Sequence, residues 1–170
     1  MREEEPAIAI PGELEKTFRA HHGLVFRTAY RITGNASDAE DVLQTVFLRL
    51  LRKPEQCDAM EKPESYLRRA AINAALDIVR ARQSIHLAEL PELPDDAAHN
   101  DGELRQALAR ALAQLKPRPA EIFTLRFLEG LSNPEIARML GISQVLVAVI
   151  VHRTRQQLRQ ELRAYLGDRS

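Results

Sequence analysis

The stretch SNPEIARMLGISQVLVAVIVHRTR, residues 132–155, decides how the rest of the chain is interpreted. Its beginning predicts a short helix, because Ser132 followed three residues later by Glu135 is the capping-box pattern of a helix start. Gly141 then predicts a turn, since glycine is favoured just after the last turn of a helix. The difficulty is VLVAVIV, which has the β-branched composition of a strand, and hydrophobic periodicity alone cannot exclude one.

The surroundings of VLVAVIV favour a helix. No other segment offers a partner strand, Ser143 can cap a helix at this point, and the strongly helical HRTRQQLRQELRAYL continues the run without a break. At 100° per residue, one narrow stripe for packing comprises Val147, Val151, Leu158, Leu162 and Tyr165. The same wheel leaves Val145, Leu146, Ala148, Val149 and His152 outside that stripe, with Arg153 nearby. A short helix, a glycine turn and a longer helix together predict a helix-turn-helix.

The rest of the chain also predicts helices, so the expected fold class is all-α, with two small helical domains joined by an acidic flexible linker. The expected bounds are 1–13 for an N-terminal tail, 14–84 for the first domain, 85–103 for the linker and 104–168 for the second domain, which carries the helix-turn-helix. Within the first domain we expect helices over 13–32, from a cap at Asn35 or Ser37 to just before Pro54, and over 64–83, with a loop over 54–62. Within the second domain we expect further helices over 103–115 and 117–128.

Bulk properties narrow the class of protein. The chain has 170 residues with a formal net charge of zero and a single cysteine, Cys57, which rules out an internal disulfide framework. No apolar run approaches the ~20 residues of a membrane span, and the acidic N-terminus lacks the apolar core of a secretory signal. These features predict a cytoplasmic protein without membrane insertion.

The distribution of charge is more informative than its sum. Residues 65–86 carry four basic residues and one acid, whereas residues 87–103 carry six acids and no lysine or arginine. Basic residues dominate again towards the C-terminus. Two basic segments flanking an acidic, proline-containing connector are typical of two modules that bind a polyanion.

Motifs for catalysis and metal binding are absent from the sequence. His21 and His22 are adjacent and would point about 100° apart on a helix, which suits one metal ion poorly. The acids Asp38, Glu40 and Asp41 have no histidine or glycine-rich partner, and the common nucleotide, zinc-protease and serine-hydrolase motifs do not occur. We therefore expect no enzyme activity, no metal and no cofactor.

Three separated segments resemble one family. RITGNASDAEDVLQTVFLRLLR, SYLRRAAINAALDIVRAR and LRFLEGLSNPEIARMLGIS with VHRTRQQLRQEL are similar to the extracytoplasmic-function (ECF) group of bacterial sigma factors, over about residues 14–84 and 104–165. The order and separation of the segments match the family. A lone helix-turn-helix would be weak evidence, because other bacterial regulators carry a similar segment.

The resemblance implies roles for three sets of residues. The polymerase-binding helix of the family matches Asp38, Glu40, Asp41, Gln44 and Arg49. The helix that faces −10 DNA matches Tyr66, Arg69, Asn73, Asp77 and Arg80, where a ring can stack on a base, an amide can read a base edge and arginines can hold phosphates. Asp77 is expected to brace its arginine neighbours. The −35 module matches Arg126, Ser143, Gln144, Leu146, Ala148, Val149, His152 and Arg153.

One departure from the family affects the −35 module. Where the family usually carries Thr, Lys or Arg, Ser and Arg, this chain has Leu146, Ala148, Val149 and Ile150. The helix could read thymine methyl groups by apolar contact, or hold phosphates and depend on DNA shape. A third possibility is that it has lost the −35 element and presents an apolar patch to a protein.

The resemblance implies a sigma factor that binds core RNA polymerase, at its β′ clamp and β flap, and recognises promoter DNA at −35 and −10 elements. An anti-sigma factor is an expected further partner. The alternatives are a helix-turn-helix regulator without polymerase contact, or a sigma-like protein whose C-terminal module binds a protein instead of −35 DNA.

Overall fold

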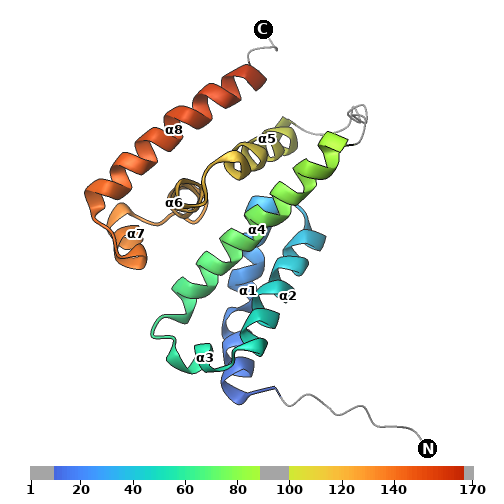
Figure 1. Cartoon of the computed structure of the whole chain (residues 1–170), viewed down its shortest axis with the longest axis vertical. Helices are drawn as coiled ribbons and strands as arrows, with labels where there is room; N and C mark the ends of the chain where they lie inside the picture. Colours follow the sequence, from blue (N-terminus) through green and yellow to red (C-terminus); the bar gives the residue numbers. More distant parts are fainter. Residues whose placement is uncertain (1–9, 89–99, 167–170) are drawn as a thin grey trace, which may run out of the picture.

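The computed structural model describes residues 10–88 and 100–166, and this part of the chain is built of eight α-helices without a strand (Figure 1). The all-α prediction is confirmed. Most of the expected N-terminal tail, the centre of the expected linker and the last residues of the chain lie outside the described residues.

Four helices form the N-terminal unit: α1 (Gly12–Thr33), α2 (Ala36–Arg52), α3 (Glu55–Ala59) and α4 (Pro63–Ala88). Helices α1, α2 and α4 pack against one another. Their apolar stripes, at the 3.6-residue spacing of amphipathic helices, meet in a core that includes the fully buried Val25, Ala29, Val42, Leu50, Leu67, Ile72 and Leu76.

The boundary between α1 and α2 follows from local chemistry. Gly34 ends α1 in the left-handed region at φ 73°, which glycine adopts without steric cost. Asn35 then caps α2, since its side-chain oxygen accepts a hydrogen bond from the backbone N–H of Asp38 at 2.9 Å. Of the two candidates, Asn35 is the cap.

Four helices form the C-terminal unit: α5 (Asn100–Gln114), α6 (Pro117–Phe127), α7 (Asn133–Leu140) and α8 (Gln144–Leu166). Helices α5, α6 and α7 all pack on α8. The centre of this packing is fully or almost fully buried and includes Leu112, Ile122, Leu125, Ile136, Val147 and Leu158.

The VLVAVIV run is helical, and α7 and α8 form the predicted helix-turn-helix with a bend of 111° between them. The capping box of Ser132 and Glu135 is present, and Gly141 ends α7 at φ 65°. Ser143 caps α8, because its Oγ accepts from the N–H of Leu146 at 3.1 Å. In the predicted stripe, Val147 and Leu158 are buried and Val151 and Leu162 are half-buried; the side chain of Tyr165 lies outside the described part.

Several predicted bounds are wrong. The loop expected over 54–62 contains the short helix α3, and α4 continues to Ala88 instead of ending at residue 83. The segment QSIHLA contains no glycine or proline that would stop the helix. Helix α5 likewise begins at Asn100, so both ends of the expected linker are helical.

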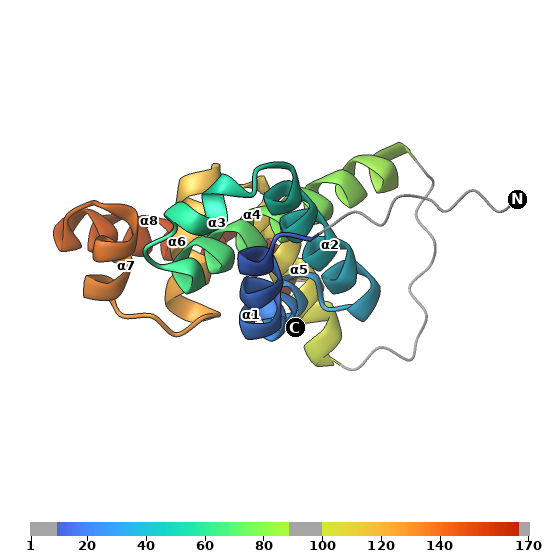
Figure 2. The same cartoon turned by 90° about the horizontal axis from the view of Figure 1, so that it is seen from below.

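The two units pack against each other. Helix α4 contacts α5 and α6 of the C-terminal unit, and α1 contacts α5. Figures 1 and 2 show α4 between α2 on one side and α7 on the other. Among the described helices, none alone has the length and apolar composition to cross a membrane, and α7 with α8 pass that test only as a sharply bent pair.

Candidate nucleic-acid interface

Helix α8 presents an exposed face that begins directly after the turn of the helix-turn-helix. Val145 is 74% exposed, Leu146 45% and Val149 39%. Ala148, His152 and Arg153 are exposed beside them, so the predicted separation of this face from the packing stripe is confirmed. We define the α8 exposed face as Val145, Leu146, Ala148, Val149, His152 and Arg153. Its first turns offer methyl groups, and its later turn offers the imidazole of His152 and the guanidinium of Arg153.

The other −35 candidates lie near the start of α8 or on α6. Ser143 and Gln144 line an open groove at the turn between α7 and α8, together with Pro134, Ala137, Arg138, Gly141 and Ile142. Arg126 lies on α6, half-buried, with its guanidinium 5.5 Å from the ring centroid of Phe127. The helix-turn-helix therefore brings together all of these candidates except Arg126, which belongs to a different helix.

The five candidate −10 residues follow one side of α4 at intervals of three and four residues. Tyr66 is exposed near α3, and its hydroxyl donates to Oε1 of Gln56 at 3.4 Å. Asn73 is half-buried. Asp77 accepts from Nη1 of Arg80 at 3.1 Å, so the expected bracing of an arginine by Asp77 is present.

Both arginines of this set are held by the C-terminal unit. Arg69 donates from Nε to Oε1 of Glu121 on α6 at 2.6 Å. Arg80 donates from Nε to the backbone carbonyl of Ala113 on α5 at 2.8 Å, and its buried Nη2 has no hydrogen-bond partner among residues 10–88 and 100–166. In this arrangement the phosphate-binding groups expected on α4 are occupied by acceptors of the same chain.

The candidate polymerase-binding residues on α2 separate into two groups. Glu40, Asp41, Gln44 and Arg49 are exposed. Asp38 is only 4% exposed, and its carboxylate accepts from Arg82 at 2.5 Å and from the amide of Asn35 at 3.1 Å. The position of Asp38 therefore favours a structural role at the start of α2 over direct contact with a partner.

Leu48 is an exposed residue of α2 that the sequence analysis did not identify as a candidate. It is 51% exposed and follows Gln44 by one helical turn, on the same side of α2 as Glu40 and Asp41. We define the α2 exposed face as Glu40, Asp41, Gln44 and Leu48. The signal was available, because Leu48 falls outside the apolar stripe of Val42, Val46 and Leu50.

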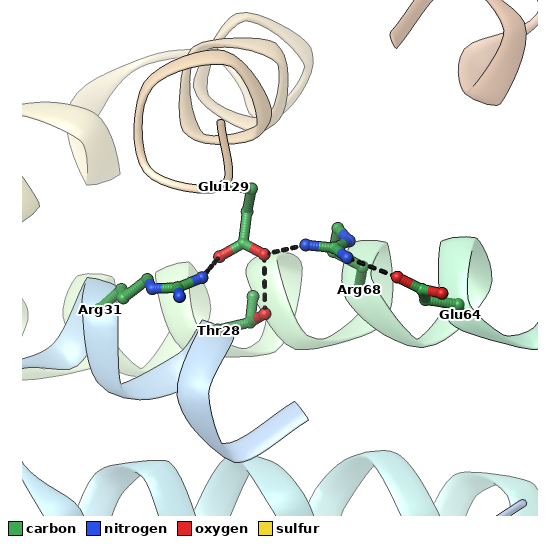
Figure 3. Close-up of polar contacts among 5 residues, drawn as sticks. All are labelled: Thr28, Arg31, Glu64, Arg68 and Glu129. Carbon is green, nitrogen blue, oxygen red and sulfur yellow. Dashed lines mark hydrogen bonds and ion pairs between the residues drawn. The ribbon is translucent and has the colours of Figure 1, made fainter. Parts of the chain in front are cut away.

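Polar residues around Glu129, in the turn between α6 and α7, form a second group that the sequence analysis did not identify (Figure 3). The side chain of Glu129 is fully buried. Its Oε1 accepts from Nη1 of Arg31 at 3.0 Å, and its Oε2 accepts from Oγ1 of Thr28 at 3.1 Å and from Nη1 of Arg68. Arg68 also pairs with Glu64 at 2.7 Å. We call Glu129, Thr28, Arg31 and Arg68 the Glu129 cluster.

The backbone of the turn fixes the position of Glu129. The N–H of Glu129 donates to the carbonyl of Thr124 at 3.0 Å, and the N–H of Leu131 donates to the carbonyl of Leu125 at 3.0 Å. Gly130 closes the turn at φ 73°. No local pattern identifies the cluster, because its donors lie 61 to 101 residues away in the sequence.

Two titratable groups have shifted pKa values. Burial raises the pKa of the Cys57 thiol above its ordinary value, and the carboxylates of Asp58 and Glu13 add to this effect, so the thiol is mostly protonated at neutral pH. Hydrogen bonds from the backbone N–H and hydroxyl of Ser132 lower the pKa of Glu135. Within the described part of the chain, no group of three or more His, Cys, Asp or Glu side chains is arranged to hold a metal ion.

Two family models match the chain. The model for sigma-70 region 2 matches residues 17–85, and the model for sigma-70 region 4 matches residues 105–158. The first match covers most of the N-terminal unit, and the second covers most of the C-terminal unit including the helix-turn-helix.

The curated relatives of this chain are RNA polymerase sigma factors. The chain is 36% identical over 157 residues to the ECF RNA polymerase sigma factor SigE of Mycolicibacterium smegmatis, with 87% of this chain and 61% of the relative covered. It is 33% identical over 152 residues to the RNA polymerase sigma-E factor of Streptomyces coelicolor, with 88% and 86% covered. It is 26% identical to the ECF sigma factor SigW of Bacillus subtilis, with 82% and 83% covered.

Solved structures share the fold. The sigma factor RpoE of Bartonella quintana, in complex with the anti-sigma factor NepR, aligns with a TM-score of 0.52 at 18% identity, over 90% of this chain and 98% of that one. CnrH, in complex with the cytosolic domain of CnrY, aligns with a TM-score of 0.55 at 23% identity, over 92% of this chain and 89% of CnrH. With both region models matched in order and with relatives above 30% identity, the chain belongs to the ECF group of RNA polymerase sigma factors.

Proposed function

We propose that this sigma factor binds core RNA polymerase and directs it to promoters with a −35 and a −10 element. The observation that carries the proposal is the α8 exposed face, which begins directly after the turn of the helix-turn-helix and presents methyl groups followed by His152 and Arg153. Such a helix fits a DNA major groove, where thymine methyl groups can be read by apolar contact and phosphates by arginine.

In this proposal each unit has its own partners. The N-terminal unit, residues 14–84, contacts polymerase through the α2 exposed face with Arg49, and −10 DNA through Tyr66, Arg69, Asn73 and Arg80. The C-terminal unit, residues 104–168, contacts −35 DNA through the α8 exposed face together with Arg126, Ser143 and Gln144. Polymerase surfaces that fit these contacts are the β′ clamp for the N-terminal unit and the β flap for the C-terminal unit.

The proposed activity is binding, without catalysis by this chain, and the proposed location is the cytoplasm, where promoter DNA and polymerase meet. The two solved relatives described above are each bound to an anti-sigma factor or to the cytosolic domain of a partner. By analogy we propose that an anti-sigma factor regulates this chain as well.

Transcription in vitro tests the proposal directly. The purified chain is mixed with core RNA polymerase and fragmented genomic DNA, and the 5′ ends of the transcripts are mapped. Start sites that share both a −35 and a −10 sequence support the whole proposal. Failure of the chain to bind core polymerase overturns it.

A second candidate function concerns only the C-terminal unit. Val145, Leu146 and Val149 form an exposed apolar surface, and such surfaces often mark protein interfaces. If they bind a protein instead of −35 DNA, the mapped start sites share a −10 sequence only. The same experiment therefore distinguishes the two assignments.

A further inference from the structure

The two units of the chain are joined by polar contacts that involve buried charge. Glu129 of the C-terminal unit has a fully buried side chain and accepts from Arg31 on α1 and from Thr28 and Arg68 on α1 and α4. Glu121, which is almost fully buried, accepts from Arg69 on α4. A buried carboxylate is stable only when charged or polar donors surround it. These contacts therefore depend on the two units being packed together.

The closed arrangement is incompatible with simultaneous binding of both promoter elements. The −35 and −10 elements are named for positions that differ by about 25 base pairs, which is about 85 Å of B-form DNA at 3.4 Å per base pair. Contacts such as Arg69–Glu121 at 2.6 Å instead hold the two units directly against each other. Under the proposed function, on which this inference rests, the units must separate before both elements can be occupied.

The contacts also cover groups that the proposed function requires. Arg69 is paired with Glu121, and Arg80 is bonded to the carbonyl of Ala113. A carboxylate or carbonyl oxygen on an arginine occupies the position that a phosphate oxygen would take. DNA and the C-terminal unit therefore compete for the same side chains of α4.

We propose that the Glu129 cluster is an autoinhibitory latch. It holds the free chain in a closed state in which the C-terminal unit covers the α4 arginines, and the latch must open for promoter binding. Glu129, Thr28, Arg31 and Arg68 are outside the residues assigned to DNA or polymerase contact, so the latch can be altered without changing the proposed binding residues.

Two variants open the latch from opposite sides. Glu129→Gln keeps the size of the side chain and removes its charge. Arg31→Ala removes a donor whose side chain is 47% exposed, which makes misfolding less of a risk. Glu64→Gln is the matched control, because Glu64 pairs with Arg68 within α4 and does not connect the two units. Helical circular dichroism verifies that each variant is folded.

The first measurement is the distance between the units in the free full-length chain. Single-molecule energy transfer is recorded between dyes on Ala20→Cys in α1 and Gln156→Cys in α8, both exposed positions, in a Cys57→Ser background. We expect one high-transfer population in the parent chain. Glu129→Gln and Arg31→Ala should shift the ratio of closed to open molecules by roughly ten- to a hundredfold, the effect of losing a hydrogen bond to a charged group, whereas Glu64→Gln should leave it unchanged.

The second measurement is affinity for a labelled single-stranded DNA 20-mer of random sequence, by fluorescence anisotropy. When only the open fraction binds, the apparent affinity is reduced in proportion to that fraction, so Glu129→Gln and Arg31→Ala should both bind more tightly. Tighter binding by Arg31→Ala is diagnostic, because loss of an arginine that contacted DNA would weaken binding instead.

Two results would overturn the proposal that the Glu129 cluster is an autoinhibitory latch. Unchanged energy transfer in both variants would mean that the cluster does not control closure, and opening without a gain in DNA affinity would mean that closure does not inhibit. Binding of each variant to core polymerase is measured in parallel. This measurement distinguishes failure of the latch proposal from failure of the proposed function. Loss of capture in every variant including the parent refutes the proposed function, whereas a failed latch leaves capture intact.

Discussion

Arg69 on α4 and Glu121 on α6 form a hydrogen-bonded ion pair of 2.6 Å between the two units of the chain. The carboxylate is almost fully buried and the guanidinium is partly exposed. The pair therefore joins an arginine proposed to hold −10 DNA to an acid that has no proposed contact with DNA or polymerase. Substitution of the arginine, but not of the carboxylate, should consequently weaken promoter binding.

Arg69→Ala should weaken promoter binding by the polymerase complex and reduce the slope of log affinity against log salt concentration by about 1, the effect of removing one phosphate contact. Glu121→Gln should not weaken binding, because it frees Arg69. Filter binding over a series of salt concentrations measures both effects. Arg19→Ala is the control, since Arg19 is exposed on α1 and pairs with Glu15, one turn earlier in the same helix. Equal losses in Arg69→Ala and Arg19→Ala would exclude a specific contact at Arg69.

Leu146→Ala and Val149→Ala should shift or abolish preference at the −35 element while core polymerase binding persists. Each removes methyl groups from the α8 exposed face, and a mismatched base pair in a specific binding site typically costs about 1–3 kcal/mol. Transcription in vitro from templates that differ only at −35 positions measures the preference. Gln160→Ala, at an exposed position further along α8, is the control. If the parent chain and both variants transcribe all templates equally, the apolar helix does not read bases.

Leu48→Ala should lower the affinity for core polymerase, because an exposed leucine beside Glu40, Asp41 and Gln44 gives the α2 exposed face an apolar centre. Leu104→Ala on α5 is a matched control, since Leu104 is a leucine of similar exposure. Titration of labelled chain with core polymerase gives both affinities. A Leu48 variant that binds as tightly as the Leu104 variant would remove Leu48 from the interface.

Asp38→Ala should reduce the stability of the N-terminal unit, in contrast to substitutions on the α2 exposed face. Its carboxylate accepts from Arg82 and Asn35 near the start of α2, and loss of such bonds costs about 1–3 kcal/mol. Urea unfolding followed by circular dichroism measures the change. Glu40→Ala, at an exposed position two residues further along α2, should leave the unfolding midpoint nearly unchanged. If the Asp38 variant is as stable as the parent chain but binds polymerase weakly, Asp38 contacts polymerase directly.

Glu135 should make the helix-turn-helix sensitive to acid. Its pKa is lowered in the folded chain by hydrogen bonds from Ser132. The stability it contributes is therefore present above its unfolded pKa, near ~4.3, and is lost as the pH falls through the lower folded pKa. Thermal unfolding of the parent chain and of Glu135→Gln between pH 7 and pH 3 checks the sign. The difference in stability between them should shrink as the pH falls, and a difference that grows would contradict the assignment.

Sequence patterns predicted the helices and their boundaries wherever the signal was local. The capping box at Ser132 and Glu135, the cap at Asn35 and the glycine turn at Gly141 all act within four residues, and all are present in the structure. The ends of the acidic connector were less well predicted. Charge and proline content indicate a solvated segment, but they do not decide how far α4 and α5 extend into it.

The assignment of side chains to faces was only partly predictable. Helical periodicity separated the α8 exposed face from the packing stripe, because that stripe repeats at the helical period. It could not show that Asp38 is buried, since its main partner, Arg82, lies 44 residues away. Nor could it show that the C-terminal unit occupies Arg69 and Arg80.

The sequence by itself determined the family, the helix content and the helix-turn-helix, because motifs, caps and apolar periods act over a few residues. Only the tertiary structure decided how the two units meet. Glu129 is buried against Thr28, Arg31 and Arg68, and no local pattern encodes a carboxylate whose donors lie 61 to 101 residues away. Burial makes those donors necessary, and chain folding alone brings them together.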